Sequence, residues 1–200
     1  MIGLSSLRRH TWRMCGPSIT DYIFKKGGSV FLDLKFHDIP NTVCYAASAG
    51  ATLPGVCMMT VHTIGGREML EAAALGVKQK SETLKIKKPA ILGVTVLTSE
   101  NFENVEEEVL RRAQVAKDAG LDGVVCSVKE AALIREKFGN DFLIVTPGIR
   151  SSEAKSDDQK RIATTADAVR AGSNYIVVGR PITQAANKKE AAKKFLSQLQ

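Results

Sequence analysis

The sequence has no long apolar segment and no pattern of a signal peptide. Its longest near-continuous apolar stretch, residues 90–97, is far shorter than the roughly 20 residues that a membrane-spanning helix needs. The short apolar start is interrupted by Arg8 and Arg9, which does not fit a secretory signal. We therefore expect a protein without a membrane partner.

Motifs for metals, nucleotide-binding loops and serine nucleophiles are also missing. The four cysteines are widely spaced without a C-x-x-C pair, which favours reduced thiols and a cytoplasmic location. Three scattered histidines give no zinc-ligand spacing, so a structural metal site is not expected. No G-x-G-x-x-G or Walker A motif follows an apolar run, and no G-x-S-x-G elbow occurs.

The composition is that of an ordinary globular protein with a local excess of positive charge. Apolar residues make up 44% and charged residues 24% of the 200 residues, which excludes disorder for the bulk of the chain. The net charge of +7 arises in the first twenty residues and in a lysine-rich stretch at 78–88. That stretch lacks interleaved aromatic side chains, so we expect a solvated loop and no nucleic-acid partner.

Six short apolar runs rich in β-branched residues predict buried strands, and helical patterns separate them. This alternation predicts βαβ units and a parallel sheet that is covered on both faces. The predicted strands are residues 30–36, 56–62, 90–97, 123–127, 142–146 and 175–179. The predicted helices are residues 41–52, 66–75, 104–119, 128–138, 165–171 and 183–199.

Polar residues at the strand ends favour a barrel over an open sheet. Charged or hydroxyl side chains close nearly every predicted strand, among them Asp33, His62 and Thr146. An open doubly wound sheet gathers its site at one crevice, whereas a (β/α)8 barrel takes catalytic groups from the carboxyl ends of many strands. We therefore predict an α/β fold of the TIM (β/α)8-barrel type.

The chain is short for this architecture. A (β/α)8 barrel typically needs about 250 residues, whereas this chain has 200 residues and six readable strands. We therefore expect an incomplete barrel. Residues 1–15 are expected to form an atypical N-terminal segment, and residues 16–200 a single barrel domain.

The segment Phe31-Leu-Asp-Leu-Lys-Phe-His-Asp-Ile-Pro-Asn-Thr42 carries the strongest chemical signal. Because side chains alternate along a strand, we expect Asp33 and Lys35 on one face, with Asp38 just beyond on the loop. Ionised groups in a low-dielectric site persist only when they are paired, and the neighbouring acids would keep Lys35 protonated. The segment predicts a proton donor; the alternative is a salt bridge that only closes the strand.

A second group of residues predicts an anion site after the last two strands. Thr146-Pro-Gly-Ile-Arg150 and Val178-Gly-Arg180-Pro181 follow these strands, where barrels frequently bind phosphate. Gly179 allows a close backbone approach, and Arg150 and Gln159 could close over the same anion. The alternative is a turn glycine with surface arginines. Thr98 either binds a ligand or caps the next helix.

Taken with the strand order, these motifs resemble those of bacterial orotidine 5'-phosphate decarboxylases. The resemblance begins at Gly16 and runs to the C-terminus, and its motifs occur in the family's order. It implies a homodimeric (β/α)8 barrel that converts orotidine monophosphate to UMP and carbon dioxide without a cofactor. The matching segments are residues 31–42, 94–99, 122–127, 145–150, 158–161 and 179–183.

The resemblance also implies a role for individual residues. Lys35 resembles the lysine that protonates carbon 6 of the pyrimidine ring, and Asp33 the carboxylate that faces the departing carboxylate. Asp38 resembles the aspartate that each subunit donates to its partner's site. Ligand contacts are implied for Thr42 and Thr98, and a phosphate grip for Arg150, Gln159, Gly179 and Arg180.

The N-terminus departs from the family pattern and leaves two alternatives open. Family members carry a first strand that ends in aspartate and a second strand with Lys-Val-Gly, of which Met1-Ile2-Gly3 would be a remnant. The resemblance therefore implies an N-terminally incomplete barrel that lacks its first βα unit and most of its second strand. One alternative is therefore a catalytically impaired remnant that still binds nucleotide phosphates. The other is a metal-dependent barrel similar to hexulose-phosphate synthase, which shares the D-x-K-x-x-D pattern.

Overall fold

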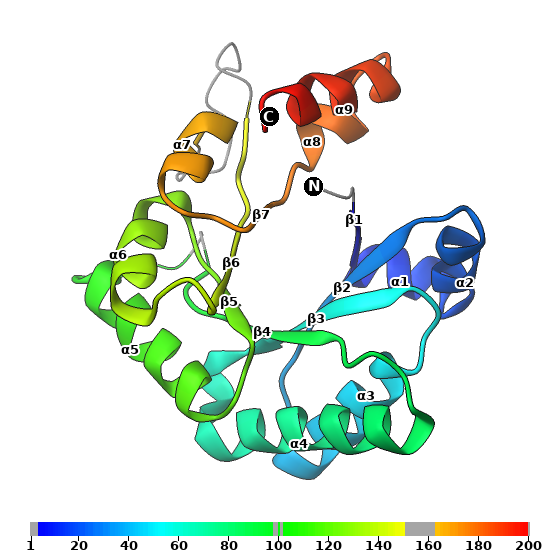
Figure 1. Ribbon diagram of the computed structural model, residues 1–200, viewed down its shortest axis with the longest axis vertical. Coiled ribbons are helices and arrows are strands. Elements are labelled where there is room, and N and C mark those ends of the chain that lie inside the picture. Colours follow the sequence, from blue (N-terminus) through cyan, green and yellow to red (C-terminus); the bar gives the residue numbers. More distant parts are fainter. Residues whose placement is uncertain (1–3, 98–99, 101, 151–162, 200) are drawn as a thin grey trace. The chain divides into compact units, whose positions relative to one another are not determined.

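The computed structural model describes residues 4–97, 100, 102–150 and 163–199 (Figure 1). The chain divides into two compact units, Met1–Thr95 with Arg112–Gly123 and Val96–Arg111 with Val124–Gln200. No helix in these described ranges is long and apolar enough to cross a membrane.

Four parallel strands form the sheet of the first unit, in the order β1-β2-β3-β4. Helices connect them, as expected for successive βα units. The strands are β1 (Leu4–Arg8), β2 (Ser29–Phe36), β3 (Val56–His62) and β4 (Ala90–Val94). The helices are α1 (Arg9–Cys15), α2 (Ser18–Lys25), α3 (Pro40–Ala51), the short helix η1 (Thr63–Gly65) and α4 (Gly66–Leu84).

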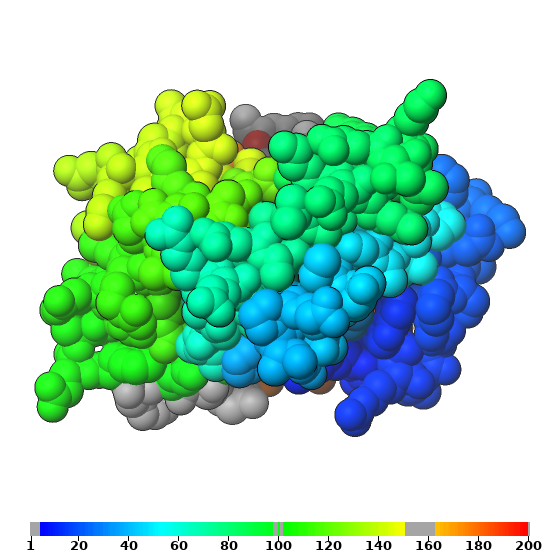
Figure 2. Space-filling model, turned by 90° about the horizontal axis from the view of Figure 1, so that it is seen from below, coloured from blue at the N-terminus to red at the C-terminus, as the bar shows by residue number. Residues whose placement is uncertain are grey.

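The core of the first unit lies around β2 and β3, whose residues are buried on both faces. Leu32 and Met59 are fully buried, and Phe31 and Met58, which precede them and face the other side of the sheet, are also buried, as a covered parallel sheet requires. α3 and α4 lie side by side (Figures 1 and 2). A Cβ atom at Gly76 of α4 would lie 2.7 Å from Cys44 Sγ and 2.8 Å from the Cys44 carbonyl oxygen. The close contact of the two helices therefore depends on glycine at this position.

The second unit continues the alternation of strands and helices. β6 pairs in parallel with β7, and within this unit the strand order is β5-β6-β7. The strands are β5 (Gly123–Val125), β6 (Leu143–Thr146) and β7 (Tyr175–Ile176). The helices are α5 (Val105–Asp118), which belongs partly to each unit, α6 (Val128–Phe138), α7 (Thr165–Arg170), α8 (Arg180–Thr183) and α9 (Lys188–Ser197).

The N-terminal segment contains a strand that the apolar pattern does not predict. β1 pairs with β2 from Leu4 opposite Ser29 to Arg8 opposite Asp33. Its sequence holds two serines and an arginine, so it lacks the apolar run by which the other six strands were recognised. The prediction of six strands is therefore one short, while the expected remnant at residues 1–3 lies outside the described residues.

Two helix predictions are wrong in extent. The lysine-rich stretch is not a loop throughout, because α4 continues to Leu84 and includes Lys78 and Lys80. Its buried stripe extends through Val77 to Ser81, which keeps the later turns packed while the lysines face outward. The predicted helix at 183–199 begins too early, because α8 ends at Thr183 and α9 begins at Lys188. The Asn187 side chain caps α9 by accepting a hydrogen bond from the Glu190 amide at 3.1 Å.

Strand order separates the two architectures considered above. In an open doubly wound sheet the order of strands is permuted relative to the chain. Here the order follows the chain within each unit, and the pairs of known register are parallel. This is the order of a (β/α)8 barrel.

Candidate active site

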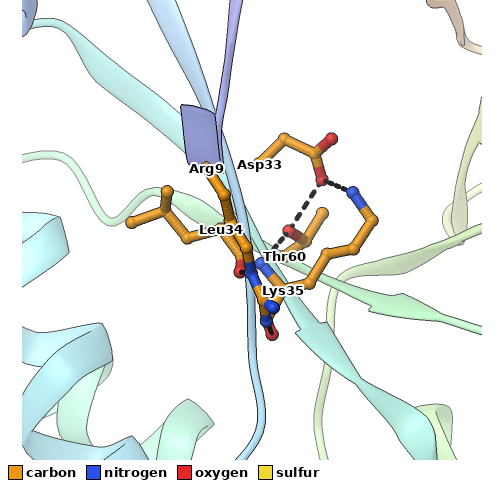
Figure 3. Close-up of polar contacts among 5 residues, drawn as sticks. All are labelled: Arg9, Asp33, Leu34, Lys35 and Thr60. Atoms are coloured by element: carbon orange, nitrogen blue, oxygen red, sulfur yellow. Dashed lines mark hydrogen bonds and ion pairs between the residues drawn. The ribbon is translucent and has the colours of Figure 1, made fainter. Parts of the chain in front are cut away.

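The predicted pair of Asp33 and Lys35 forms an ion pair on β2. Lys35 Nζ donates to Asp33 Oδ1 at 2.6 Å, and the two side chains are 27% and 13% exposed (Figure 3). Charge-assisted hydrogen bonds of this length are among the stronger polar contacts in proteins, and partial burial limits screening by water. The contact therefore fixes the lysine ammonium while leaving it accessible to a ligand.

The strand is irregular at Lys35, so simple alternation does not explain how the pair is formed. Lys35 has a φ of 52°, in the left-handed region that non-glycine residues rarely adopt. Leu32 pairs with Met59 but Phe36 pairs with Val61, so four steps on β2 match two on β3. A bulge thus re-aims the lysine, as bulges do beside active sites.

Thr60 of β3 connects the bulge to the aspartate. Its hydroxyl accepts a hydrogen bond from the Lys35 amide at 3.0 Å and donates one to Asp33 Oδ1 at 3.0 Å. Thr60 is fully buried, so both hydrogen bonds of its hydroxyl are shielded from water. The sequence reading missed this residue; its only signal is a lone hydroxyl among the buried apolar residues of the strand.

Arg9, the first residue of α1, binds the other side of the bulge. Its Nε donates to the Leu34 carbonyl at 2.7 Å, and its Nη2 donates to the Lys35 carbonyl at 2.8 Å (Figure 3). The sequence reading assigned no role to this residue, because it lies 26 positions before Lys35 in the unassigned N-terminal segment. No local pattern could have connected the two.

Asp38 and Thr42 lie on either side of Pro40, where α3 begins. Asp38 is exposed, and its Oδ1 accepts a hydrogen bond from the Ile39 amide at 2.7 Å. Within the described part of the chain no ion pair joins Asp38 to Lys35. Asp38 and Thr42 line a pocket of about 290 Å³, together with Arg9, Leu34 and His37 among others.

The residues of the predicted phosphate grip that the structure describes belong to the second unit. Arg150 is 9% exposed, and its amide donates to the Ala163 carbonyl at 3.0 Å, which ties down the chain after β6. Ile149, Val178 and Ile182 pack in one apolar cluster. This packing gathers the segments that carry Arg150, Gly179 and Arg180.

Two predicted ligand contacts cannot be located. Thr98 and Gln159 lie outside the described residues. The described members of the predicted set divide between the units, with Asp33, Lys35, Asp38 and Thr42 in the first and Arg150, Gly179 and Arg180 in the second.

Comparisons with known proteins identify the family. The sequence model of the "Orotidine 5'-phosphate decarboxylase / HUMPS family" matches residues 10–195. An orotidine 5'-phosphate decarboxylase of a Geobacter species is 45% identical over 207 aligned positions, which cover 99% of this chain and 85% of the relative. The enzyme of Hydrogenovibrio crunogenus is 50% identical over 179 positions, covering 85% of this chain and 73% of its own.

A solved structure agrees with these relatives. The crystal structure of orotidine 5'-phosphate decarboxylase from Lactobacillus acidophilus superposes with a TM-score of 0.83 at 36% identity, covering 97% of this chain and 85% of that one. The prediction of a TIM (β/α)8 barrel is confirmed, and seven of its strands lie in the described ranges. The chain belongs to the orotidine 5'-phosphate decarboxylase family of carbon–carbon lyases.

Proposed function

We propose that this chain decarboxylates orotidine 5'-phosphate to UMP in pyrimidine biosynthesis, with Lys35 as the proton donor. The observation that carries the proposal is the Lys35–Asp33 contact of 2.6 Å on β2. Among the described residues, Asp33 is the single hydrogen-bond partner of the Lys35 ammonium. Its remaining N–H groups are therefore available to a substrate, which a purely structural salt bridge would not require.

The proposed reaction exchanges carbon dioxide for one proton at carbon 6. The bond between carbon 6 of the pyrimidine ring and its carboxylate breaks, carbon dioxide leaves, and the electron pair stays on carbon 6. An N–H of Lys35 protonates that carbon, and the neutral amine then regains a proton from solvent. A fixed ammonium next to the developing carbanion stabilises it with little reorganisation.

Asp33 has a matching role in this proposal. Its Oδ1 accepts hydrogen bonds from both Lys35 Nζ and Thr60 Oγ1. Its Oδ2 has no hydrogen-bond partner among the described residues. We assign this oxygen to the face that meets the substrate carboxylate, where the paired ammonium limits the repulsion between the two anions.

The phosphate group is assigned to the second unit. Arg150, Gly179 and Arg180 follow the last two strands, where (β/α)8 barrels frequently bind phosphate. The low exposure of Arg150 favours a binding role, because a guanidinium withdrawn from water gains from an anionic partner. Gln159, Thr42 and Thr98 complete the assigned ligand contacts.

A homodimer is part of the proposal, with Asp38 acting in the partner's site. Asp38 is exposed and precedes Ile39, which is 66% exposed, while Tyr45 of the following helix α3 is 69% exposed. Exposed large apolar side chains are typical of a protein interface. A cytoplasmic location is also proposed, and the four free thiols support it.

The test is turnover of orotidine 5'-phosphate by the purified chain, compared with its Lys35→Ala and Lys88→Ala variants. Lys88 forms a similar 2.6 Å pair with Asp122 away from the strand bulge, so its loss controls for the removal of a lysine. We expect Lys35→Ala to lose nearly all turnover while still binding UMP, and Lys88→Ala to keep it.

Two outcomes would favour the alternatives. UMP binding by the unaltered chain without any turnover would indicate a nucleotide-binding remnant. Turnover that disappears with a chelator and returns with magnesium would indicate a metal-dependent enzyme and overturn the assignment to Lys35.

A further inference from the structure

The backbone of Lys35 needs support from outside its own strand. In the described ranges only Lys35 and Lys85 are non-glycine residues with positive φ. Lys85 directly follows α4 as its C-terminal cap, where a left-handed residue is ordinary. Lys35 lies inside a strand, and a side chain there clashes with its own backbone in this conformation. Such a residue persists only where its surroundings hold it.

The bulge also removes backbone groups from the ladder of β2 and β3. The register shifts between Leu32 and Phe36, and residues 33–35 have no paired residue on β3. Arg9 donates to the carbonyls of Leu34 and Lys35, at 2.7 Å and 2.8 Å. A planar guanidinium can bind two neighbouring acceptors at once, which a lysine ammonium does less well.

The other surroundings of Arg9 do not explain its position. It occupies the first turn of α1, which contains no acidic residue and where a cation is disfavoured by the helix dipole. Asp38 lines the same pocket, yet in the part of the chain described no ion pair joins it to Arg9. The described hydrogen bonds of this guanidinium both go to the bulge.

We propose that Arg9 is a positioning residue that holds the left-handed bulge and thereby keeps the Lys35 ammonium on Asp33. Arg9 acts from α1 on the two carbonyls, while Thr60 acts from β3 on the amide (Figure 3). The backbone of Lys35 is thus held on both sides. This inference rests on the proposed role of Lys35 as proton donor.

The test compares Arg9→Ala and Arg9→Lys with Arg67→Ala as the matched control. Arg67 is an exposed arginine of the first unit that pairs with Glu71 one turn along its own helix. We expect Arg9→Ala to lower kcat by about 10- to 100-fold, because small displacements of a catalytic group have effects of this size. UMP affinity should stay within about twofold, since Arg9 itself is not assigned to the ligand. The kcat of Arg9→Lys should fall between those of Arg9→Ala and Arg67→Ala.

A rescue experiment separates positioning from general loss of structure. Added guanidinium ion at millimolar concentration should restore part of the kcat of Arg9→Ala and none of that of Lys35→Ala. A misfolded variant would not respond to the ion. If Arg9→Ala does not fold, Arg9→Lys takes its place. A kcat of Arg9→Lys below that of Arg67→Ala then supports the inference, and an equal kcat contradicts it.

The conformation of Lys35 gives a readout that does not depend on activity. Backbone chemical shifts of residues 34 and 35 should report the left-handed conformation in the unaltered chain and its loss in both Arg9 variants. If the unaltered chain has no turnover, the proposed function fails, while these shifts still judge the role of Arg9. Unchanged shifts together with unchanged kcat in Arg9→Ala would overturn the inference.

Discussion

The hydroxyl of Thr60 accepts a hydrogen bond from the amide of Lys35 at 3.0 Å, so the proposed proton donor is held through its backbone as well as its ammonium. The same hydroxyl donates to Asp33 Oδ1. One buried atom on β3 therefore touches both members of the ion pair. Removing this hydroxyl is expected to reduce catalysis, although it is assigned no contact with the substrate.

Thr60→Val tests this contact, because valine keeps the branched shape and removes the hydroxyl. The Lys35 amide then loses its acceptor, which for a buried group costs about 1–3 kcal/mol of stability. We expect a lower melting temperature and a reduced kcat, measured by thermal unfolding and steady-state kinetics. Thr60→Ser, which retains the hydroxyl, should stay close to the unaltered protein in kcat, and an equal loss in both variants would contradict the role of the hydroxyl.

Subunit mixing tests the assignment of Asp38 to the partner's site. Lys35→Ala and Asp38→Ala subunits should each be nearly inactive alone. Mixed and refolded in equal amounts, they should recover about one quarter of the unaltered activity, because about half of the dimers are mixed and each carries one intact site. Activity is measured at fixed total protein, and the absence of recovery would place Asp38 in its own subunit's site or outside any site.

Arg180→Ala tests the phosphate grip. The phosphate of the substrate is remote from the reacting carbon, yet binding energy gained there can still stabilise the transition state. We therefore expect kcat/KM to fall by at least about tenfold, together with weaker UMP binding. Arg111→Ala removes an exposed arginine that pairs with Glu108 on its own helix and should leave both values unchanged. A normal kcat/KM in Arg180→Ala would exclude the assigned role.

Cys126 predicts a loss of stability at alkaline pH. Burial raises the pKa of this thiol well above its ordinary value of 9.0, and the nearby Glu130 raises it further. Above about pH 9 the unfolded chain releases the proton that the folded chain retains, so the free energy of unfolding falls as the pH rises, by at most about 1.4 kcal/mol per pH unit. Below that pH the contribution of the thiol is fully present.

Chemical unfolding between pH 8 and pH 10.5 measures this effect. Cys126→Ala should show a shallower alkaline decline than the unaltered protein. Cys15→Ala removes an exposed thiol and should reproduce the original slope. Equal slopes in all three proteins would mean that the Cys126 thiolate forms as easily in the folded chain as in the unfolded one.

The sequence was sufficient to predict the ion pair of β2 but not the backbone that carries it. The spacing of Asp33 and Lys35 and their place at a strand end led to the ion pair, which the structure contains. The left-handed conformation at Lys35 has no local signal, because no glycine marks it. Arg9 was beyond reach for a different reason: its contacts are made across 25 and 26 positions of chain, and hydrophobic periodicity carries no information about such pairs.

The fold was predictable where apolar runs are strong. Six strands were placed from their β-branched residues, while β1 was missed because its serines and arginine resemble a loop. α4 was ended too early because Lys78 and Lys80 masked a buried stripe that continues at Val77 and Ser81. Side chains that face water can obscure a helix whose other face is packed.

The contact at Gly76 makes the position of α3 depend on a residue that does not line the pocket. α3 begins at Pro40 and carries Thr42 near its start, while Cys44 one turn later meets Gly76 of α4. A methyl group at 76 would press on the Cys44 carbonyl and shift the end of α3 that carries Thr42. A substitution at Gly76 of the neighbouring helix is thus expected to alter the part of the pocket wall that α3 contributes.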